Sequence, residues 1–485
     1  MFLTSVTLMN SLPGSVPSNT WKQSFLWMSL AAVCFQASYT SIHYPSCGFF
    51  ILGYAFFLVR LVNQPTVRRA FYFGLATGFL CYAPQLFFFW RIFNLAAVVL
   101  WLILAAWVGL FAAICCGCVR GVLPDKIVWL IPIIWTGLEY FRSELYYLKF
   151  SWMNVGYALP PFLNVMGMYG LGFLVFSLAA SLNFSKGFPR YRHGAVLVAL
   201  GLAFAFLKLP ATPPPAAKLA PDTALTIVGV QMEFPNEKLV TKALTKALAK
   251  NTNAQIFVLS ECTLDGGVTD GIKAWCRDHE RYLFVGGKDV VTNDIYFNTA
   301  FVVDTNGEVI FTQAKSVPVQ FFKDGLPARK QEVWDSPWGR IGLCICYDLS
   351  YTRVTDGLVS RGAQLLIVPT MDVSEWGRHQ HELHSRVAPV RAAEYDIPIF
   401  RLASSGISQA VPADGYVTAQ THVGGIDEVL SAKVTLAGHP RKPWDRVLAP
   451  LCLCFTIVIL GLRLGVTFKT AIQERRARRR SRSTI

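Results

Sequence analysis

Charged residues are scarce in this sequence of 485 residues, of which 15% are charged and 53% are hydrophobic. The mean hydropathy is +0.40. Soluble globular chains carry about 25% charged residues. The composition therefore excludes an ordinary soluble domain and indicates a membrane protein.

Several motifs are missing as well. No internal repeat of fixed period is apparent, and no basic patch interleaved with aromatic residues stands out, so we expect no nucleic-acid partner. The first residues lack a basic segment and a small-residue cleavage site. The first apolar run is therefore interpreted as a retained anchor rather than a removed signal peptide.

Eight apolar runs are long enough to cross a bilayer as helices. They lie near 24–42, 47–62, 70–90, 94–118, 127–141, 163–183, 193–208 and 447–468. Arginine and lysine gather in alternate loops and in the tail after the last run, which predicts that these segments are cytoplasmic. Much of the net charge of +15 comes from these loops and the tail. The anionic headgroups of the membrane are the nearest partner for that charge. The long segment before the last run would then face the periplasm of a Gram-negative cell.

These observations predict a chain of five parts. They are a membrane domain of about seven helices at 1–208, a proline-rich linker at 209–222, a soluble domain at 223–440, a helix at 447–468 and a basic cytoplasmic tail at 469–485. The glycine-rich run at 167–172 lies inside a predicted span, so it is not interpreted as a dinucleotide fingerprint.

Short β-rich runs and helical patterns alternate in the soluble domain, which is typical of a layered α/β fold. Helical patterns cover 236–250 and 378–395, and Asn306-Gly307 is a hairpin signal. The predicted strands are 224–231, 255–260, 282–287, 298–304, 308–312, 364–369 and 398–403.

The apolar run at 339–348 ends on Cys346-Tyr347-Asp348. A thiol at a strand end is held by the sheet while its sulfur faces a pocket, and the Tyr347 amide can point at the oxygen of an attacked carbonyl. The alternative is a small core residue, because free cysteines are usually buried. The other soluble cysteines, Cys262, Cys276 and Cys344, show no spacing typical of a disulfide framework or a zinc site.

Two more polar residues follow predicted strands. Glu261 ends an apolar strand, where α/β domains expose a general base, and Lys315 follows the predicted hairpin. Each alone is equally consistent with a solvated strand end. The order glutamate, lysine, cysteine resembles the nitrilase superfamily, and so do later segments over about 220–435, including Trp376-Gly377 and Arg391-Ala-Ala-Glu394. The resemblance implies an αββα sandwich.

The arrangement of the predicted spans indicates one family within this superfamily. Seven helices before the domain and one after it, with Glu139-Tyr-Phe-Arg142 and Phe150-Ser151-Trp152 between spans five and six, are similar to the apolipoprotein N-acyltransferase family. That family implies a multi-pass protein of the bacterial inner membrane, expected to be a monomer without metal or cofactor. Its partners would be a phospholipid acyl donor and a diacylglyceryl-apolipoprotein acceptor.

The resemblance also implies roles for individual residues. Glu261 would remove the thiol proton, Cys346 would carry the acyl chain as a thioester, and Lys315 with the Tyr347 amide would stabilise the oxyanion. Asp348 would help to position the site. The expected lipid or substrate loop residues are Phe150, Trp152, Tyr157 and Trp376.

The sequence departs from the family after Lys315. The second glutamate of the family is missing, which leaves Asp324 and Gln320 as candidate replacements, and Asp348 stands where this branch commonly has glutamate. One alternative is a membrane-tethered amidase that transfers the acyl group to water. Another is a metal-binding or transport protein that uses three histidines, His379, His381 and His384.

Overall fold

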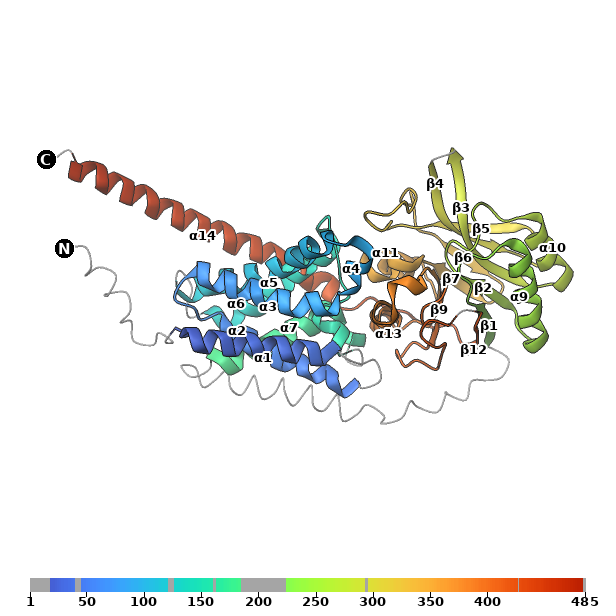
Figure 1. Cartoon of the computed structure of the whole chain (residues 1–485), viewed down its shortest axis with the longest axis horizontal. Coiled ribbons are helices and arrows are strands. Elements are labelled where there is room, and N and C mark those ends of the chain that lie inside the picture. The colour runs from blue at the N-terminus through green and yellow to red at the C-terminus, as the bar shows by residue number, and fades with distance from the viewer. Residues whose placement is uncertain are drawn as a thin grey trace.

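The protein consists of a bundle of long helices and an α/β domain at one end of it (Figure 1). The computed structural model describes residues 18–39, 45–120, 126–159, 163–184, 224–292, 295–425 and 427–482. The seventh predicted span, 193–208, and the predicted linker, 209–222, lie outside the described residues.

The bundle contains a helix at each of the other seven predicted spans and a short helix, α4, at the end of the third. They are α1 (Trp21–Tyr39), α2 (Phe50–Leu61), α3 (Val67–Gln85), α4 (Phe88–Phe93), α5 (Ala96–Arg120), α6 (Ile127–Tyr140), α7 (Leu163–Phe184) and α14 (Asp445–Arg482). Among the described residues, three stretches are long and apolar enough to cross a membrane: Ala96–Arg120, Met166–Phe184 and Asp445–Gly465. Helix α14 continues to Arg482, so the segment predicted as a tail begins as helix.

Glycines set two features of the bundle. A Cβ at Gly78 of α3 would lie 2.7 Å from the Ala105 Cα of α5, so glycine allows these two helices to pack backbone to backbone. Gly167 interrupts α7 with a φ of 71°. This kink frees the backbone amide of Tyr169 to donate to Asp445 Oδ2 at 2.8 Å, which fixes α14 against α7.

The α/β domain contains two six-stranded sheets. The first has the order β12-β1-β2-β3-β4-β5 and the second the order β11-β10-β9-β8-β7-β6. The strands of the first sheet are β1 (Leu225–Val230), β2 (Ile256–Leu259), β3 (Tyr282–Thr292), β4 (Ile295–Val303), β5 (Val309–Ala314) and β12 (Val429–Val434). The strands of the second are β6 (Val333–Ser336), β7 (Gly339–Leu343), β8 (Leu365–Thr370), β9 (Ile399–Ala403), β10 (Gln409–Val411) and β11 (Ala419–Gln420).

Strand β2 explains how the layers assemble. Ile256 and Val258 belong to the core that contains both sheets, whereas Phe257 and Leu259 pack against helices α9 (Glu237–Lys250) and α10 (Asp270–His279). Because side chains alternate along a strand, a continuous apolar run buries both faces of its sheet. The predicted αββα sandwich is therefore confirmed.

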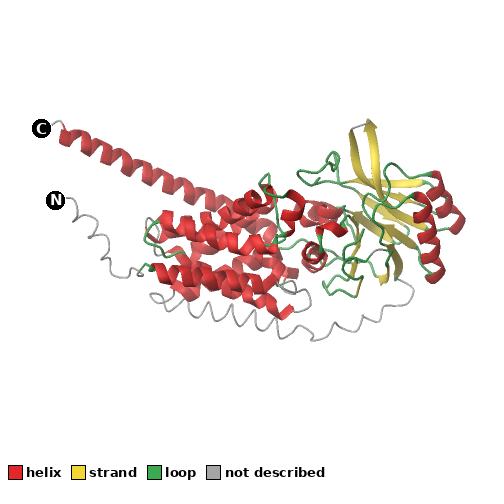
Figure 2. Ribbon diagram, in the orientation of Figure 1, coloured by secondary structure: helices red, strands yellow, loops and turns green. Residues whose placement is uncertain are grey.

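The helices of the second sheet face the bundle (Figure 2). They are α11 (Thr352–Ser360), α12 (Arg378–Ser385) and α13 (Val387–Tyr395). The helical pattern predicted over 378–395 is confirmed, with a break of one residue, Arg386, between α12 and α13. Pro389 lacks the amide that would bind Ser385 O, which ends the first helix there.

Two further predictions concern strands, and only one of them agrees with the structure. The strand expected to run to Cys346 ends at Leu343, because the chain turns into the short helix η8 (Cys346–Ser350). The hairpin predicted at Asn306-Gly307 is confirmed, since β4 and β5 pair antiparallel and Gly307 has a φ of 80°.

Candidate active site

Glu261, Lys315 and Cys346 each follow a strand of the sandwich. Glu261 comes after β2, Lys315 directly after β5, and Cys346 after β7. β2 and β5 belong to one sheet and β7 to the other. The packing of the two sheets therefore gathers a carboxylate, an ammonium and a thiol at one place, with all three side chains buried.

Lys315 lies between two carboxylates. Its Nζ is 2.7 Å from Glu261 Oε1 and 2.7 Å from Asp324 Oδ2, and the residue is 1% exposed. Asn298 Nδ2 donates to both acids at 2.7 Å. Burial disfavours the ammonium charge, but nearby negative charges, led by Glu261, outweigh burial and raise the pKa of Lys315 well above its usual value. Lys315 is therefore a fixed cation.

Of the two candidate replacements for the family's second glutamate, only Asp324 reaches Lys315. Its Oδ2 also accepts from the Val319 amide at 2.7 Å. The Asp324 carboxylate therefore also stabilises the loop after β5, to which both residues belong. Gln320 lies instead on the wall of the cavity described below and donates to Tyr147 O at 3.3 Å.

The Cys346 thiol is connected to Glu261 through the backbone of Met371. Its Sγ lies 3.7 Å from Met371 O, while the Met371 amide donates to Glu261 Oε2 at 2.9 Å. Cys346 has a φ of 52°, a left-handed conformation that costs a non-glycine residue about 1–3 kcal/mol and is common at active sites. Burial, followed by the charge of Glu261, raises the pKa of the thiol well above its usual value. The thiol therefore needs a base to become a nucleophile.

Asp348 holds the turn that carries the thiol. Its carboxylate accepts from the amides of Ile345 at 3.1 Å, Ser316 at 3.0 Å and Val317 at 2.7 Å. Burial raises the pKa of Asp348 to about 6, although these bonds oppose the shift. The side chain is fully buried and is absent from the cavity wall, so it ties η8 to the residues that follow Lys315.

An apolar cavity of about 140 Å³ leads to Cys346 from helices α4 and α5 of the bundle. Of the residues expected to contact substrate, Tyr347, Phe150, Trp152 and Trp376 line it. Tyr157 does not, and its hydroxyl lies 3.5 Å from Ser151 Oγ behind the wall. The remaining wall residues include Phe88, Phe89, Ile92, Phe93, Leu100, Leu104, Phe321, Phe322 and His384.

The histidines predicted as an alternative metal site have other partners. His381 Nε2 is 3.0 Å from Val373 O, and His384 Nδ1 is 2.7 Å from Asp372 Oδ1. Within the described part of the chain, no group of three or more His, Cys, Asp or Glu side chains is arranged to hold a metal ion.

Sequence reasoning missed Asn298 and Met371. Asn298 appears in the sequence as the first residue of a predicted strand, and only its contacts with two distant acids reveal its place in the site. Met371 acts through its backbone, so its side chain carries no signal. A polar residue inside an otherwise apolar strand could have drawn attention to Asn298.

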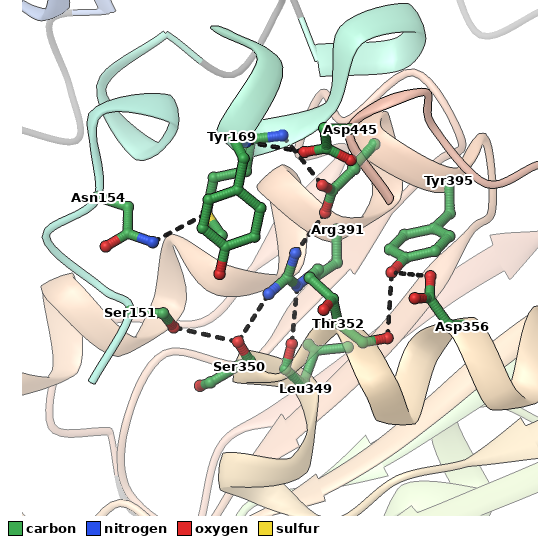
Figure 3. A network of polar contacts seen from close by, with 12 residues as sticks. Ser151, Asn154, Tyr169, Leu349, Ser350, Thr352, Asp356, Arg391, Tyr395 and Asp445 are labelled. Carbon is green, nitrogen blue, oxygen red and sulfur yellow. Dashed lines mark hydrogen bonds and ion pairs between the residues drawn. The ribbon is translucent and has the colours of Figure 1, made fainter. Parts of the chain in front are cut away.

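A second buried ion network lies behind η8, where the α/β domain meets the bundle (Figure 3). We name it the junction cluster: Arg391, Glu394, Asp445 and Arg446. Arg446 contacts Glu394 Oε1 at 3.0 Å and Asp445 Oδ1 at 2.5 Å, and Arg391 forms an ion pair with Glu394. The Met168 amide of α7 donates to Glu394 at 3.0 Å.

The junction cluster reaches the turn that carries the thiol. Arg391 donates through Nε to Leu349 O at 2.9 Å and through Nη2 to Ser350 O at 2.6 Å. From the bundle side, Ser151 Oγ donates to the same Ser350 carbonyl at 3.0 Å (Figure 3), and Trp152 Nε1 donates to Ser350 Oγ at 2.9 Å. The end of η8 is therefore held by both domains.

Comparison with known proteins gives two family matches. Residues 221–438 match the carbon-nitrogen hydrolase family, and residues 31–181 match the apolipoprotein N-acyltransferase N-terminal domain. The apolipoprotein N-acyltransferase of Geobacter metallireducens is 24% identical, over 87% of this chain and 92% of that protein. That of Rhizobium rhizogenes is 25% identical, over 60% of this chain and 63% of that protein.

Two solved structures resemble the α/β domain. A carbon-nitrogen hydrolase from Helicobacter pylori G27 has a TM-score of 0.39 and 17% identity, covering 44% of this chain and 89% of that chain. An amidase of the nitrilase superfamily from Nesterenkonia AN1 has a TM-score of 0.39 and 20% identity, covering 45% of this chain and 93% of that chain.

The αββα sandwich, the strand-end thiol and the matched family model define a carbon-nitrogen hydrolase domain. That domain is joined here to a helical bundle with its own family match, and related proteins cover most of the chain. Over most of its length, the chain is therefore similar to the apolipoprotein N-acyltransferases.

Proposed function

We propose that this protein transfers an acyl chain from a membrane phospholipid to the α-amino group of the diacylglyceryl-modified cysteine of an apolipoprotein. The observation that carries the proposal is the apolar cavity that joins helices α4 and α5 to the Cys346 thiol. An acyl chain could lie there while its ester reaches the nucleophile. Similarity to the apolipoprotein N-acyltransferases supports the same activity.

In the first half of the reaction, Glu261 takes the proton of the Cys346 thiol and the thiolate attacks the carbonyl carbon of the phospholipid ester. Lys315 and the Tyr347 amide stabilise the oxyanion that forms. The bond to the glycerol oxygen then breaks, and that oxygen leaves with a proton. The acyl chain remains on sulfur as a thioester and a lysophospholipid departs.

Asp324 takes the place of the family's missing glutamate in this scheme. It contacts Lys315 from the loop after β5, so the ammonium keeps two carboxylate partners. In the second half of the reaction, the acceptor amine attacks the thioester, the carbon–sulfur bond breaks and an amide forms. The enzyme returns to its starting state, as in a ping-pong reaction.

The orientation of the protein is part of the proposal. We place the α/β domain in the periplasm, the residues after the last span in the cytoplasm, and the protein in the inner membrane as a monomer. The alternation of basic loops supports this orientation. Three described stretches that are long and apolar enough to span a bilayer support the membrane location.

The experiment is mass spectrometry of the Cys346 peptide after the detergent-purified protein is incubated with phospholipid. We expect an acyl adduct that hydroxylamine removes, and its loss in Cys346→Ala. Cys344→Ala is the matched control, because Cys344 is also buried but is absent from the cavity wall. Free fatty acid in place of amide, in the presence of a diacylglyceryl-cysteine peptide, would favour a hydrolase. An adduct that persists in Cys346→Ala would reject the thioester.

A further inference from the structure

One buried histidine on the cavity wall, paired with an acid behind it, has no part in the mechanism above. His384 of α12 is 3% exposed and lines the same cavity as Cys346. Its Nδ1 lies 2.7 Å from Asp372 Oδ1, and Asp372 is fully buried. A carboxylate paired with a histidine beside a nucleophile is an arrangement that can move protons.

The partners of Asp372 keep it ionised. Arg401 Nη2 contacts its Oδ2 at 2.6 Å, and Gln380 Nε2 donates to its Oδ1 at 3.0 Å. Burial favours the neutral acid, but the contacts with His384 and Arg401 outweigh burial and hold the pKa of Asp372 well below its usual value. An ionised carboxylate can only accept hydrogen bonds, so the imidazole places its hydrogen on Nδ1. In a neutral ring, Nε2 then carries the lone pair.

The imidazole ring is also fixed in orientation. It stacks on Trp152 with ring centroids 4.6 Å apart and an interplanar angle of 17°. Trp152 is anchored by its bond to Ser350 Oγ at 2.9 Å, and its ring lies 6.1 Å from that of Tyr347. His384 is therefore held against the same turn that carries the thiol.

Burial favours the neutral form of His384. Burial is the main cause that lowers its pKa below the usual value; Asp372 opposes this shift, and Arg401 and His381 reinforce it. Across the cavity the ionisable groups on the wall are Cys346, Tyr347 and Lys149. A neutral imidazole is ready to accept a proton.

Glu261 differs from His384 in its access to the cavity. Its Oε1 accepts from Lys315 and Asn298, and its Oε2 accepts from the Met371 amide. Glu261 is not part of the cavity wall. His384 lies on the cavity wall, with Nδ1 as the ring atom bound to Asp372.

We propose that His384, oriented by Asp372, accepts the proton that the acceptor amine loses when it attacks the Cys346 thioester. The nitrogen–carbon bond forms, the carbon–sulfur bond breaks, and one proton moves from nitrogen to imidazole. The imidazolium then returns that proton to the departing thiolate, so the enzyme ends as neutral imidazole and thiol. This inference rests on the proposed function and assigns the base of its second half-reaction.

The test separates the two half-reactions in single-turnover experiments with the full chain in detergent. Acylation of Cys346 by phospholipid is measured first, and transfer from the isolated acyl-enzyme to a diacylglyceryl-cysteine peptide second. In His384→Gln we expect acylation within about twofold of wild type and transfer slower by about 10²-fold, a typical effect of losing a general base. Asp372→Asn should also slow transfer.

His381→Gln is the matched control, since His381 is equally buried on the same helix and is not part of the cavity wall. His384→Phe keeps a ring to stack on Trp152 while removing the proton acceptor. It therefore tests the role of the imidazole even if His384→Gln is poorly folded. Both variants at His384 should give the same selective loss of transfer.

The pH profile of wild-type transfer gives a readout that packing alone would not move. We expect the rate to fall on the acid side as an imidazole becomes protonated, and this limb to disappear in His384→Phe. Equal losses in both half-reactions, unchanged transfer in the variants, or a wild-type profile without this limb would overturn the assignment. Absence of any Cys346 adduct in wild type would instead reject the proposed function.

Discussion

The α/β domain contains two buried ion networks that differ in their surroundings. Glu261, Lys315 and Asp324 form the first, beside a thiol. The junction cluster forms the second, between α13 and the bundle helices α7 and α14. The first borders the apolar cavity through its neighbour Cys346, whereas no residue of the second lines that cavity.

The neighbours of the two networks differ too. In the first, one ammonium lies between two carboxylates, next to a thiol whose pKa is raised. In the second, two arginines pair with Glu394, Asp445 and Asp356, and Arg391 also donates to backbone carbonyls of η8. Burial of charge is therefore common to catalysis and to architecture. The thiol and the adjoining cavity distinguish the catalytic network.

The largest effect that would sharpen this contrast comes from Lys315→Met. We expect acylation of Cys346 to slow by about 10³-fold, because the oxyanion loses a fixed cation. The measurement is the rate of adduct formation by mass spectrometry. Lys288→Met is the control, since Lys288 pairs with the exposed Asp265. Near-normal acylation in Lys315→Met would remove Lys315 from the site.

The next effect concerns stability, in the junction cluster. Glu394→Gln leaves the buried charges of Arg391 and Arg446 without their shared acid. Removing one partner of a buried ion pair costs about 3–5 kcal/mol, so we expect a clear drop in the thermal unfolding temperature in detergent. The molecules that remain folded should still acylate Cys346 at a rate within about tenfold of wild type. A large loss in the acylation rate without a loss of stability would contradict the structural role of the junction cluster.

A smaller kinetic effect is expected for Asp324→Asn. The amide keeps the side-chain shape but removes one of two negative charges on Lys315, and hydrogen bonds to charged groups contribute about 1.5–3 kcal/mol. We expect acylation to slow by about 10- to 100-fold, measured at saturating phospholipid. Gln320→Ala serves as the comparison, because Gln320 does not reach Lys315. A larger loss in Gln320→Ala would reverse the assignment of the replacement acid.

The smallest effect is expected at the surface. Asp265 forms an ion pair with Lys288 while its side chain remains 95% exposed. Exposed pairs contribute little, so Asp265→Asn should change the free energy of unfolding by less than about 0.5 kcal/mol and leave acylation unchanged. Denaturant titration tests the first expectation. A loss of stability as large as that of Glu394→Gln would show that burial does not explain the difference between the junction cluster and the exposed Asp265–Lys288 pair.

Much of the site was accessible from the sequence because its residues mark the ends of strands. Glu261, Lys315 and Cys346 each follow an apolar run, and apolar runs report local structure directly. Trp152 and Trp376 were also predicted, through the resemblance to the family, and both line the cavity. Tyr157 was predicted with them but lies behind the wall, since the sequence does not reveal which way a loop residue points.

The sequence by itself indicated a membrane protein with a layered α/β domain, because hydropathy and the alternation of apolar residues depend on near neighbours in the chain. The αββα arrangement was implied by the resemblance to the nitrilase superfamily. Only the tertiary structure decided which acid reaches Lys315, that Met371 connects the thiol to Glu261, and that His384 pairs with Asp372. Asp372 lies 12 positions from His384, and Met371 lies 110 from Glu261. Such contacts depend on the path of loops and the packing of two sheets, for which no local pattern exists.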